Sequence, residues 1–570
     1  MIMENIYRGH FDPELIRIGP ASMDEAKVGM IVEQYRQILK DYLSGRSEAE
    51  GLLPAELLRK MGDSGFFGLT VETEYGGLGL NLSEYLKVVG EIARLDIPVA
   101  FTFLAHLSIG IKALQLFGNE GQKHYYLRKA ASGDMIFAFA LTEPRIGSDA
   151  QHIETTAVMS EDETHYVLNG RKTYITNANY AGGMTVFAQQ NPKEPGFIGA
   201  FIVETGWDGV QIGKEMPKMG LGSSSTAPVQ FRNVRVPKEN LIGMPGEGFK
   251  IAMSVLNYGR LGLGASSASI MRLSAREMLN RATSRVQFQV PISSFQLIQE
   301  KIVRARVGEA VSSAMNNLAA MTLQAHPLLP SAIETSHCKL FGTTRAWEAA
   351  YDALQTAGGA GYLKTLPYEK RMRDIRVTTV FEGTTEVHSI YPALWGMRLI
   401  AKSLKDAGRS SLSLVGDLLK LLVKGQNWPL FYENSVMQKA FREANRCAKA
   451  ARVLLLSGLL LYGKKIARGD TANREFLFRR ITTLSLYSFG LLALLRETDI
   501  KHKAGAVQAE DLRILQYFAA EANQARKDNK RFFDSRKEKV NGALFREYSN
   551  SQSEGGDKTG PEGQAATPEK

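Results

Sequence analysis

The spacing of apolar residues changes twice along this chain, at about Phe137 and again at about Met244. Before Phe137 and after Met244, apolar residues recur every three or four positions, which is typical of amphipathic helices. Between them lie short β-branched and aromatic runs, separated by Asn-Gly, Gly-Gly and Pro-containing turns, and these predict strands. We therefore expect a compact β domain between two helical ones.

At 570 residues the chain is too long for one core, and about 150 residues per domain predicts three or four domains. The fold class that we expect is α+β. Its expected parts are an N-terminal helical domain at 1–136, a middle β domain at 137–247, a four-helix domain at 248–399, an extra basic helical domain at 400–548, and a disordered tail at 549–570 rich in Ser, Gly, Glu, Gln and Pro.

The cysteine content is low, with only Cys338 and Cys447, which are far apart and have no metal-ligand neighbours. This excludes a disulfide framework and predicts no metal site, and it favours a reducing compartment. Apolar residues at 44% and charged residues at 23% are typical of a soluble globular protein.

The first residues, M-I-M-E-N-I-Y-R-G-H-F-D, lack the apolar region of a signal peptide, and their early acids argue against a mitochondrial presequence. The longest apolar run, Val453 to Tyr462, is far shorter than the roughly 20 residues of a spanning helix. We therefore expect a cytoplasmic protein with no membrane-spanning segment.

The net charge of +11 comes from one region. Residues 401–570 contain 30 Lys and Arg against 19 Asp and Glu, whereas the charges of residues 1–400 balance. The basic surface is therefore separable from the rest of the protein.

The segment Arg371 to Glu386 reads R-M-R-D-I-R-V-T-T-V-F-E-G-T-T-E, with Glu382 at its centre. Alone, such a motif also fits a surface acid beside a helix N-cap. Four further blocks precede it. They are F-A-L-T-E-P-R-I-G-S-D at Phe139 to Asp149, Y-V-L-N-G-R-K-T-Y-I-T-N at Tyr166 to Asn177, F-R-N-V-R-V-P-K-E-N-L-I-G at Phe231 to Gly243, and Q-T-A-G-G-A-G-Y at Gln355 to Tyr362.

Together these blocks resemble the acyl-CoA dehydrogenase family of flavoproteins over roughly residues 30 to 400. L-N-Y-G-R, K-M-G-L and the C-terminal extension are most similar to the very-long-chain members. The resemblance implies a homodimeric FAD-dependent oxidoreductase of fatty acid β-oxidation, which converts long-chain acyl-CoA to trans-2-enoyl-CoA. Electrons would pass to an electron-transferring flavoprotein.

The resemblance also implies that Glu382 is the base that takes the α-proton of the thioester while the β-hydrogen leaves as hydride to the flavin. Burial beside Phe381 should raise the pKa of Glu382 towards working pH. Some family members carry the base at the position matching Gly259, and glycine cannot serve, so Glu382 is the only candidate.

The remaining site residues are carried over by position. Those expected at the flavin are Phe139, Leu141, Thr142, Gly147, Ser148, Tyr174, Ile175 and Thr176. Those expected at the dinucleotide tail, which the family shares between neighbouring subunits, are Arg285, Gln287, Phe288, Gln296, Gln355, Thr356, Ala357, Gly358 and Gly359. Thr384, Thr385 and Glu386 would reach back to the cofactor, and Ser148, Asn257, Tyr258, Gly259, Arg260, Phe381 and Gly383 would contact substrate.

Several positions depart from the family pattern. Arg145-Ile146 stand where T-E-P-x-x-G-S-D usually has small residues, and Gln289 stands where a glycine usually follows R-x-x-F. Neither change removes a catalytic group.

The segment Asn445 to Arg468 places Arg446, Lys449, Arg452, Lys464, Lys465 and Arg468 around an apolar centre. It fits peripheral contact with an anionic membrane, and the matching region of the very-long-chain relatives is associated with the inner membrane. It fits equally a core helix of a bundle whose charged ends are solvated.

Three alternative functions share this fold. An acyl-CoA oxidase would hand electrons to oxygen, and the absence of a peroxisomal C-terminal tripeptide disfavours it. A non-catalytic flavoprotein could bind nucleic acid through its basic C-terminal region, although we expect no nucleic-acid partner. A scaffold role could coexist with activity.

Overall fold

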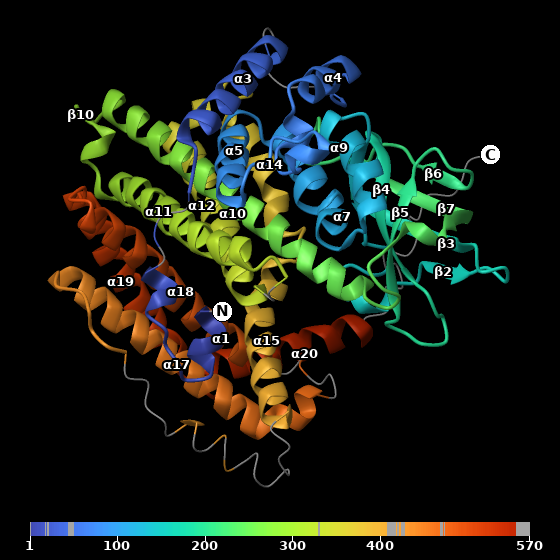
Figure 1. The fold of residues 1–570 in the computed structure, drawn as a ribbon. Coiled ribbons are helices and arrows are strands. Elements are labelled where there is room, and N and C mark those ends of the chain that lie inside the picture. The colour runs from blue at the N-terminus through green and yellow to red at the C-terminus, as the bar shows by residue number, and fades with distance from the viewer. Residues whose placement is uncertain are drawn as a thin grey trace.

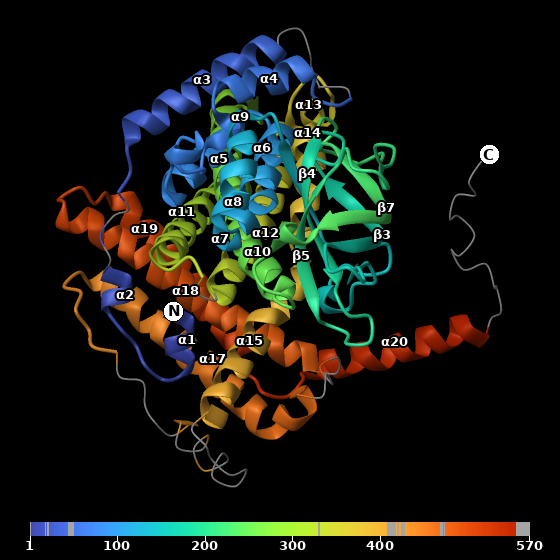
Figure 2. The same cartoon turned by 45° about the vertical axis from the view of Figure 1, so that its right-hand side comes forward.

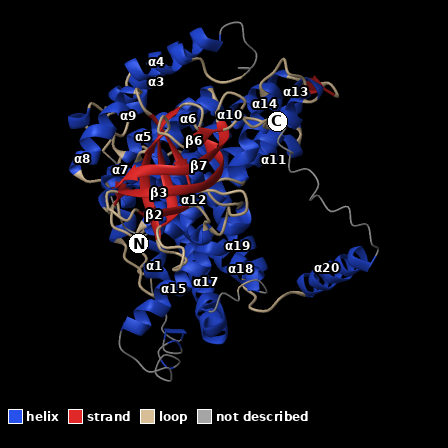
Figure 3. Ribbon diagram, turned by 90° about the vertical axis from the view of Figure 1, so that its right-hand side faces the viewer, coloured by secondary structure: helices blue, strands red, loops and turns tan. Residues whose placement is uncertain are grey.

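The structure is a computed structural model, and it describes residues 2–17, 19, 22–43, 51–328, 331–406, 416, 418, 421–422, 428–467, 471 and 474–554. Helices form most of the molecule, and one sheet lies against their side (Figure 1). Figure 3 shows the strands gathered in one block, apart from a small hairpin. The α+β class expected from the sequence is confirmed.

The N-terminal domain is helical. Its main elements are α3 (Glu25–Leu43), α4 (Ala55–Asp63), α5 (Leu82–Leu95), α6 (Ile97–Leu104), the π-helical turn η3 (Ala105–Gly110), α7 (Lys112–Phe117) and α9 (Arg128–Ser132). Side chains set where two of them begin. Asn81 and Glu84 form a reciprocal capping box at the start of α5, and the Asp96 carboxylate accepts from the N–H of Val99 at 3.0 Å to start α6.

The middle domain is a sheet. Its strands are β1 (Ile136–Ala140), β2 (Thr156–Met159), β3 (His165–Thr176), β4 (Ala181–Gln189), β5 (Ile198–Glu204), β6 (Val210–Ile212), β7 (Thr226–Pro237) and β8 (Leu241–Ile242). They follow the order β6-β7-β3-β2-β4-β5-β8, and β1 pairs in parallel with β4. The sheet has its own buried core, which includes Leu168, Phe201 and Phe231. It therefore forms a stable platform for the loop that follows β1.

The helical bundle consists of α10 (Gly248–Ser284), α11 (Gln296–Ala325), α12 (Ala332–Ala357), α14 (Tyr368–Arg376) and α15 (Thr385–Asp406). A hairpin of β9 (Val286–Gln287) and β10 (Val290–Pro291) joins α10 to α11. Helix α10 lies between α5, α11 and α12. Helix α11 approaches α10 closely at Gly264, where a Cβ would lie 2.4 Å from the side-chain oxygen of Asn316.

The C-terminal helices α17 (Ser435–Ala467), α18 (Glu475–Lys503) and α19 (Ala509–Asn529) pack against α11 and α15. The short helices α1 (Ile2–Tyr7) and α2 (Glu14–Arg17) join them (Figure 2). The N–H of Met3 donates to Glu334 at 3.0 Å, and Arg452 donates to the carbonyl of Tyr7 at 3.3 Å. The first 17 residues thus lie with the C-terminal helices, although the sequence grouped them with the N-terminal domain.

The last described helix, α20 (Arg536–Glu554), projects away from the body (Figure 2). Buried Arg480 pairs with Glu538 at its start, where Ser535 and Glu538 cap each other. The sequence predicts disorder from residue 549, but the helix continues to Glu554, because helix-forming Lys, Glu, Arg and Ala upstream propagate it. The rest of that predicted tail lies outside the described residues.

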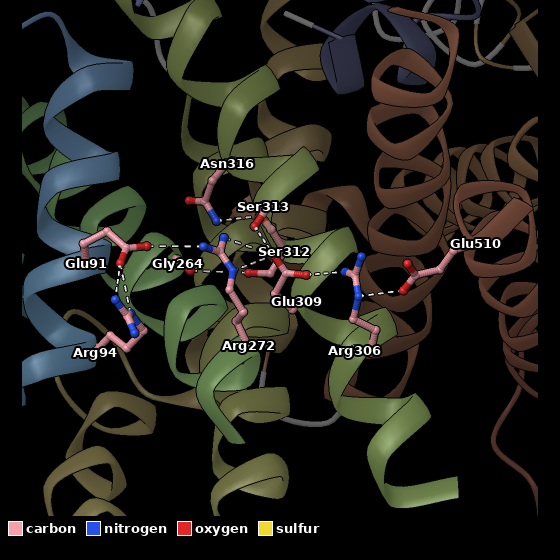
Figure 4. Close-up of polar contacts among 10 residues, drawn as sticks. All are labelled: Glu91, Arg94, Gly264, Arg272, Arg306, Glu309, Ser312, Ser313, Asn316 and Glu510. Atoms are coloured by element: carbon pink, nitrogen blue, oxygen red, sulfur yellow. Dashed lines mark hydrogen bonds and ion pairs between the residues drawn. The ribbon is translucent and has the colours of Figure 1, made fainter. Parts of the chain in front are cut away.

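A chain of ion pairs joins the domains across α5, α10, α11 and α19 (Figure 4). Arg272 on α10 contacts Glu91 and Glu309, each at 3.2 Å, and Glu309 also binds Arg306 at 2.5 Å. Arg306 then reaches Glu510 at 2.9 Å. Because Glu309 is buried and serves two arginines, this chain couples the C-terminal helices to the bundle.

One helical stretch, Ile97–Phe117, is long and apolar enough to cross a membrane by length and composition. The prediction from the sequence overlooked it because Thr, His and Ser interrupt its apolar run. In the structure 94% of its apolar window is buried inside the protein, so it is a core segment of the N-terminal domain.

Candidate active site

Glu382 lies in a sharp turn between η8 (Val377–Thr379) and α15. Its backbone is left-handed, with φ of 57°, and Gly383 follows with φ of 96°. A Cβ on Gly383 would lie 2.7 Å from Nε2 of His388, so only glycine fits there. A non-glycine residue held at positive φ is uncommon and concentrates at functional sites.

Glu382 is half-buried as a residue, and one of its carboxylate oxygens is enclosed. Its Oε2 is buried and has no hydrogen-bond partner among the described residues. Burial raises the pKa of Glu382 to about 7, while the positive charges of Arg260 and Lys339 oppose that rise. The direction is the one that the sequence predicts. A carboxylate with a pKa near neutrality is an effective general base.

The walls around this carboxylate are apolar and come from distant segments. The rings of Phe381 and Phe101 on α6 lie 5.7 Å apart. A Cβ built on Gly259 of α10 would lie 3.0 Å from Cγ2 of Ile109 and 3.2 Å from Cδ of Glu382. The fold thus brings Gly259, Phe381, Glu382 and Gly383 together, as their predicted roles require.

The other predicted substrate residues of α10 are buried. Arg260 points its guanidinium over the ring of Tyr391 at 5.6 Å and lies 3.4 Å from Oδ1 of Asn257. Asn257 also accepts from Oγ1 of Thr335 at 2.8 Å, and the Tyr258 hydroxyl lies 3.4 Å from the carbonyl of Pro327. Arg260 therefore acts on Glu382 through its charge, while Asn257 is engaged within the protein.

A buried ion pair anchors the loop after β1, and it was not predicted from the sequence. Nζ of Lys172 lies 2.7 Å from Glu143, and it also donates to the carbonyl of Leu141 at 3.0 Å. The Lys172 ammonium lowers the pKa of Glu143 against the effect of burial, and burial lowers the pKa of Lys172 to about 8. The N–H of Thr173 donates to the carbonyl of Thr142 at 2.9 Å, which ties the loop to β3.

The predicted flavin residues lie on and beside this loop. Leu141 and Ile175 are buried, Phe139, Thr142 and Thr176 are half-buried, and Gly147 and Ser148 are exposed. Tyr174 is 66% exposed in a left-handed conformation, with φ of 57°. An exposed aromatic residue in strained backbone next to buried neighbours is a surface suited to a planar ligand.

Two contacts connect this surface to the Glu382 turn. The Asn177 amide, directly after Thr176, donates to the carbonyl of Thr102 on α6 at 2.9 Å. The N–H of Leu221 donates to Asp374 of α14 at 2.6 Å. The β domain therefore abuts both the helix that carries Phe101 and the helix that leads to Glu382.

The remaining predicted cofactor residues lie elsewhere. Arg285, Gln287, Phe288 and Gln296 are exposed where α10 ends and α11 begins. Gln355, Gly358 and Gly359 are exposed at the end of α12, whereas Thr356 and Ala357 are buried. Lys301 and Arg304 of α11 both bind Asp352 of α12, each at 2.5 Å, so these two helix ends are neighbours.

This second group is remote from Glu382 within one chain. Gly259 and Ser284 are 25 positions apart on α10, and at about 1.5 Å per residue this is roughly 38 Å. By contrast, Thr384, Thr385 and Glu386 lie directly beside Glu382, where Oγ1 of Thr384 accepts from the N–H of Val387 at 3.3 Å.

Two further polar residues at the Glu382 turn were missed from the sequence. Lys339 of α12 and His388 of α15 are completely buried there. The signal for Lys339 was a polar stripe, since Thr335, Lys339 and Thr343 recur every four residues on the buried face of α12. Polar side chains on the inner face of a helix indicate a buried polar partner.

Three family models match the chain in sequence. They are the acyl-CoA dehydrogenase N-terminal domain at residues 26–134, the middle domain at 138–234 and the C-terminal domain at 246–391. These ranges coincide with the helical domain, the sheet and the bundle of the fold.

Similar proteins include the mitochondrial very-long-chain specific acyl-CoA dehydrogenases. That of Homo sapiens is 34% identical over 517 residues, which are 89% of this chain and 74% of the relative. That of Macaca fascicularis is 39% identical over 371 residues, which are 64% of this chain and 56% of the relative. The crystal structure of an acyl-CoA dehydrogenase complexed with FAD from Bacillus anthracis has a TM-score of 0.77 at 25% identity and covers 95% of this chain and 94% of its own.

The domain order, the enclosed glutamate and these similarities agree. The residues beyond 400 are also accounted for, since the Bacillus anthracis structure extends over the C-terminal helices. The family is FAD-dependent, and its members are oxidoreductases. The chain belongs to the acyl-CoA dehydrogenase family.

Proposed function

We propose that this protein oxidises long-chain acyl-CoA to trans-2-enoyl-CoA in fatty acid β-oxidation and passes the electrons to an electron-transferring flavoprotein. The observation that carries the proposal is the buried, unpartnered Oε2 of Glu382, on a carboxyl whose pKa burial raises to about 7. The very-long-chain relatives support a long acyl chain.

Glu382 would take the α-proton of the thioester. Proton abstraction next to a thioester requires a base that is ionised at working pH and close to the carbon acid. Arg260 and Lys339 favour the ionised carboxylate, while Phe101, Ile109 and Phe381 give its surroundings an apolar wall. FAD, when bound, supplies an acceptor for the β-hydrogen as hydride.

The residues present fit FAD. Tyr174, Thr176 and the loop from Phe139 to Ser148 offer backbone groups and hydroxyls beside an exposed aromatic ring. At the far bundle end, a Cβ on Gly358 or Gly359 would meet nothing within 4 Å, so a ligand can approach the backbone there. Exposed Arg285 offers a guanidinium, which matches phosphate geometry.

The two clusters of cofactor residues support a homodimer. The far cluster begins roughly 38 Å along α10 from Gly259, which lies beside Glu382, so we infer that one cofactor does not contact both clusters within one chain. In a homodimer, the far cluster of one subunit would complete the site of the other. Phe288, at the tip of the β9–β10 hairpin, is 89% exposed, and such an aromatic residue suits burial against a partner.

We also propose peripheral contact with an anionic membrane surface, in line with the expected cytoplasmic location. On α17, Leu454, Leu455 and Leu456 are buried and Arg452 points inward to Tyr7, which supports the core-helix interpretation for its centre. The outer face of α17 carries exposed Arg446, Lys449, Val453, Leu461, Lys464 and Lys465, and Arg468 lies outside the described residues. Basic residues around exposed apolar ones suit anionic lipid.

The decisive experiment adds palmitoyl-CoA anaerobically to the purified flavoprotein and follows the visible flavin absorption band. The wild type should bleach, whereas Glu382→Gln should not, with the same flavin content. A wild-type flavin that stays oxidised with acyl chains from butyryl to stearoyl would overturn the proposed function. Stoichiometric peroxide release in air, with no electron transfer to an electron-transferring flavoprotein, would instead identify an oxidase.

A further inference from the structure

We propose that Lys339 and His388 are positioning residues for Glu382, holding the two carbonyls of its left-handed turn, and that the Lys339 ammonium keeps the carboxylate ionised. This inference rests on the proposed role of Glu382 as the base. Neither residue belongs to the motif that contains Glu382, since Lys339 lies on α12 and His388 lies one turn into α15.

Lys339 holds the peptide that follows Glu382. Its Nζ donates to the carbonyl oxygen of Gly383 at 2.5 Å, and its side chain is completely buried. A buried ammonium costs several kcal/mol unless charge or hydrogen bonds compensate it. Burial lowers the pKa of Lys339 to about 7, and the negative charge of Glu382 opposes that lowering. The lysine and the glutamate therefore stabilise each other's charged forms.

His388 holds the carbonyl of Glu382 itself. Its Nε2 lies 2.8 Å from that oxygen, and its Nδ1 lies 3.0 Å from Oγ of Ser336. A carbonyl can only accept, so Nε2 carries the hydrogen and Nδ1 accepts from the serine hydroxyl. Burial holds the pKa of His388 well below its usual range, so the ring is neutral and its tautomer is set.

The two contacts have a common consequence. The backbone at Glu382 and Gly383 is left-handed at both residues, which costs energy for Glu382 and must be sustained by its surroundings. The consecutive carbonyls are anchored from two different helices, and the His388 ring also occupies the space over Gly383. The direction of the Glu382 side chain is thus determined by α12 and α15 together.

The titratable groups around Glu382 come from three elements. Arg260 approaches from α10, Lys339 from α12, and Glu386 and His388 belong to α15. His388 is neutral, and Arg260 is charged at every working pH. Replacing Lys339 therefore removes one positive charge near Glu382 and leaves the charge of Arg260 in place.

The first test measures the rate of anaerobic flavin reduction by palmitoyl-CoA against pH, per bound flavin, in Lys339→Met, Lys339→Gln and Lys339→Arg. Without the ammonium, the pH at which the rate of flavin reduction is half-maximal should increase by on the order of one unit. Near pH 6.5 the rate should then fall about tenfold, and at high pH it should return towards the wild-type plateau. Lys339→Arg, which keeps the charge, should keep the wild-type midpoint.

A merely structural lysine would lower the rate equally at every pH, and that result, or an unchanged profile, would overturn the electrostatic part of the proposal. Lys501→Met is the matched control, because it removes an ion-pairing lysine from the remote α18. If Lys339→Met fails to fold, Lys339→Gln retains a donor for the Gly383 carbonyl and carries the same test.

The positioning role of His388 has its own pair of variants. His388→Leu removes the donor to the Glu382 carbonyl, so kcat should fall at every pH, with little change in KM or in the midpoint. His388→Gln retains an N–H donor and should recover most of the rate. Equal losses of kcat in His388→Leu and His388→Gln, or no loss in His388→Leu, would show that the hydrogen bond does not position the base.

A double-mutant cycle tests the coupling without substrate. Thermal unfolding of wild type, Lys339→Met, Glu382→Gln and the double variant should give a favourable coupling at pH 7 that vanishes at pH 5, where Glu382 is protonated. No coupling at either pH would overturn the proposal. This result stands even if no acyl-CoA reduces the wild-type flavin, so failure of the proposed function and failure of this inference are distinguishable.

Discussion

Gly259 leaves the space that the carboxylate of Glu382 occupies, since a Cβ built on Gly259 would lie 3.2 Å from both Cδ and Oε2 of that side chain. The two residues are 123 positions apart and come from α10 and the turn before α15. A side chain placed at 259 would therefore point at the same reacting region as the native glutamate.

This proximity predicts that the base can be moved. Glu382→Gly should lower the rate of flavin reduction by roughly 10²–10⁴-fold, and adding Gly259→Glu should recover part of that loss. The backbone permits Glu382→Gly, because glycine adopts a φ of 57° without steric cost. The control is Gly259→Ala with Glu382→Gly, which fills the same space without a carboxylate, and equal recovery in that control would contradict the prediction.

The pKa of Glu382 predicts how activity depends on pH. Only the ionised carboxylate accepts the α-proton, and burial raises its pKa to about 7. The rate of flavin reduction should therefore rise with pH and be half-maximal near pH 7, measured by stopped-flow absorbance in buffers of constant ionic strength. A rate that is flat from pH 5.5 to 8.5 would contradict this assignment.

Because its pKa is raised by burial, ionised Glu382 lowers the stability of the folded protein. The folded state binds the proton more tightly than the unfolded chain, so stability falls as pH rises from the unfolded value of 4.5 through about 7. Glu382→Gln should remove that loss and raise the apparent Tm at pH 8, by on the order of 1–2 °C, more than at pH 4.5. An equal change at both pH values would show that ionisation is not the cause.

The buried pair of Lys172 and Glu143 should control flavin retention. Lys172→Met leaves a buried carboxylate without its counter-charge and should destabilise the β domain by about 3–5 kcal/mol. The loop from Phe139 to Ser148 would loosen, so the flavin-to-protein ratio should fall together with the apparent Tm. Lys172→Met combined with Glu143→Gln removes both charges and should partly restore the flavin-to-protein ratio and the apparent Tm. If neither quantity recovers, lost packing and not the unpaired charge is the cause.

Exposed Phe288 should support the dimer. Phe288→Asp places a charge at the hairpin tip and should shift the protein towards monomer and lower its flavin content, as measured by light scattering and absorbance. Met30→Asp on α3 is the control, because Met30 is likewise exposed, at 68%, but lies outside both cofactor clusters. An unchanged mass for Phe288→Asp would remove the hairpin from the subunit interface.

The outer face of α17 should carry the membrane contact. Replacing Arg446, Lys449, Lys464 and Lys465 by Glu should abolish flotation with vesicles that contain anionic lipid, since each basic residue near such a surface contributes about 1 kcal/mol. Replacing exposed Lys193, Arg232, Arg235 and Lys238 of the β domain by Glu changes the net charge equally and should leave flotation intact. Absence of wild-type binding would exclude peripheral association.

Much of the architecture could be predicted from local patterns. The change of apolar spacing at Phe137 and Met244 locates the sheet between helices, because helices and strands impose periods of 3.6 and 2 on any chain that buries one face. The motif around Glu382 and the four blocks before it were sufficient to predict the family and FAD. The raised pKa of Glu382 was also predicted, because the family resemblance implies that this glutamate is a base buried beside Phe381.

Contacts between distant segments were not predictable in this way. Nothing near Met3 indicates that its N–H binds Glu334, and nothing near Ile97 distinguishes a buried core segment from one exposed to lipid. His388 has no local signature, and the polar stripe of α12 that contains Lys339 does not show which group this lysine contacts. Local patterns report which face of an element is buried, and they do not report what lies against that face.

The sequence alone therefore determined the succession of domains, the family, the cofactor and the candidate base, because these follow from local periodicity and from motifs contiguous in the chain. The tertiary structure alone decided that Gly259, Arg260, Lys339 and His388 surround one carboxylate, and that the far cluster of predicted cofactor residues begins roughly 38 Å along α10 from Gly259. The physical reason is that pKa, strain and reach depend on distances in space, which are set only when elements far apart in sequence pack together.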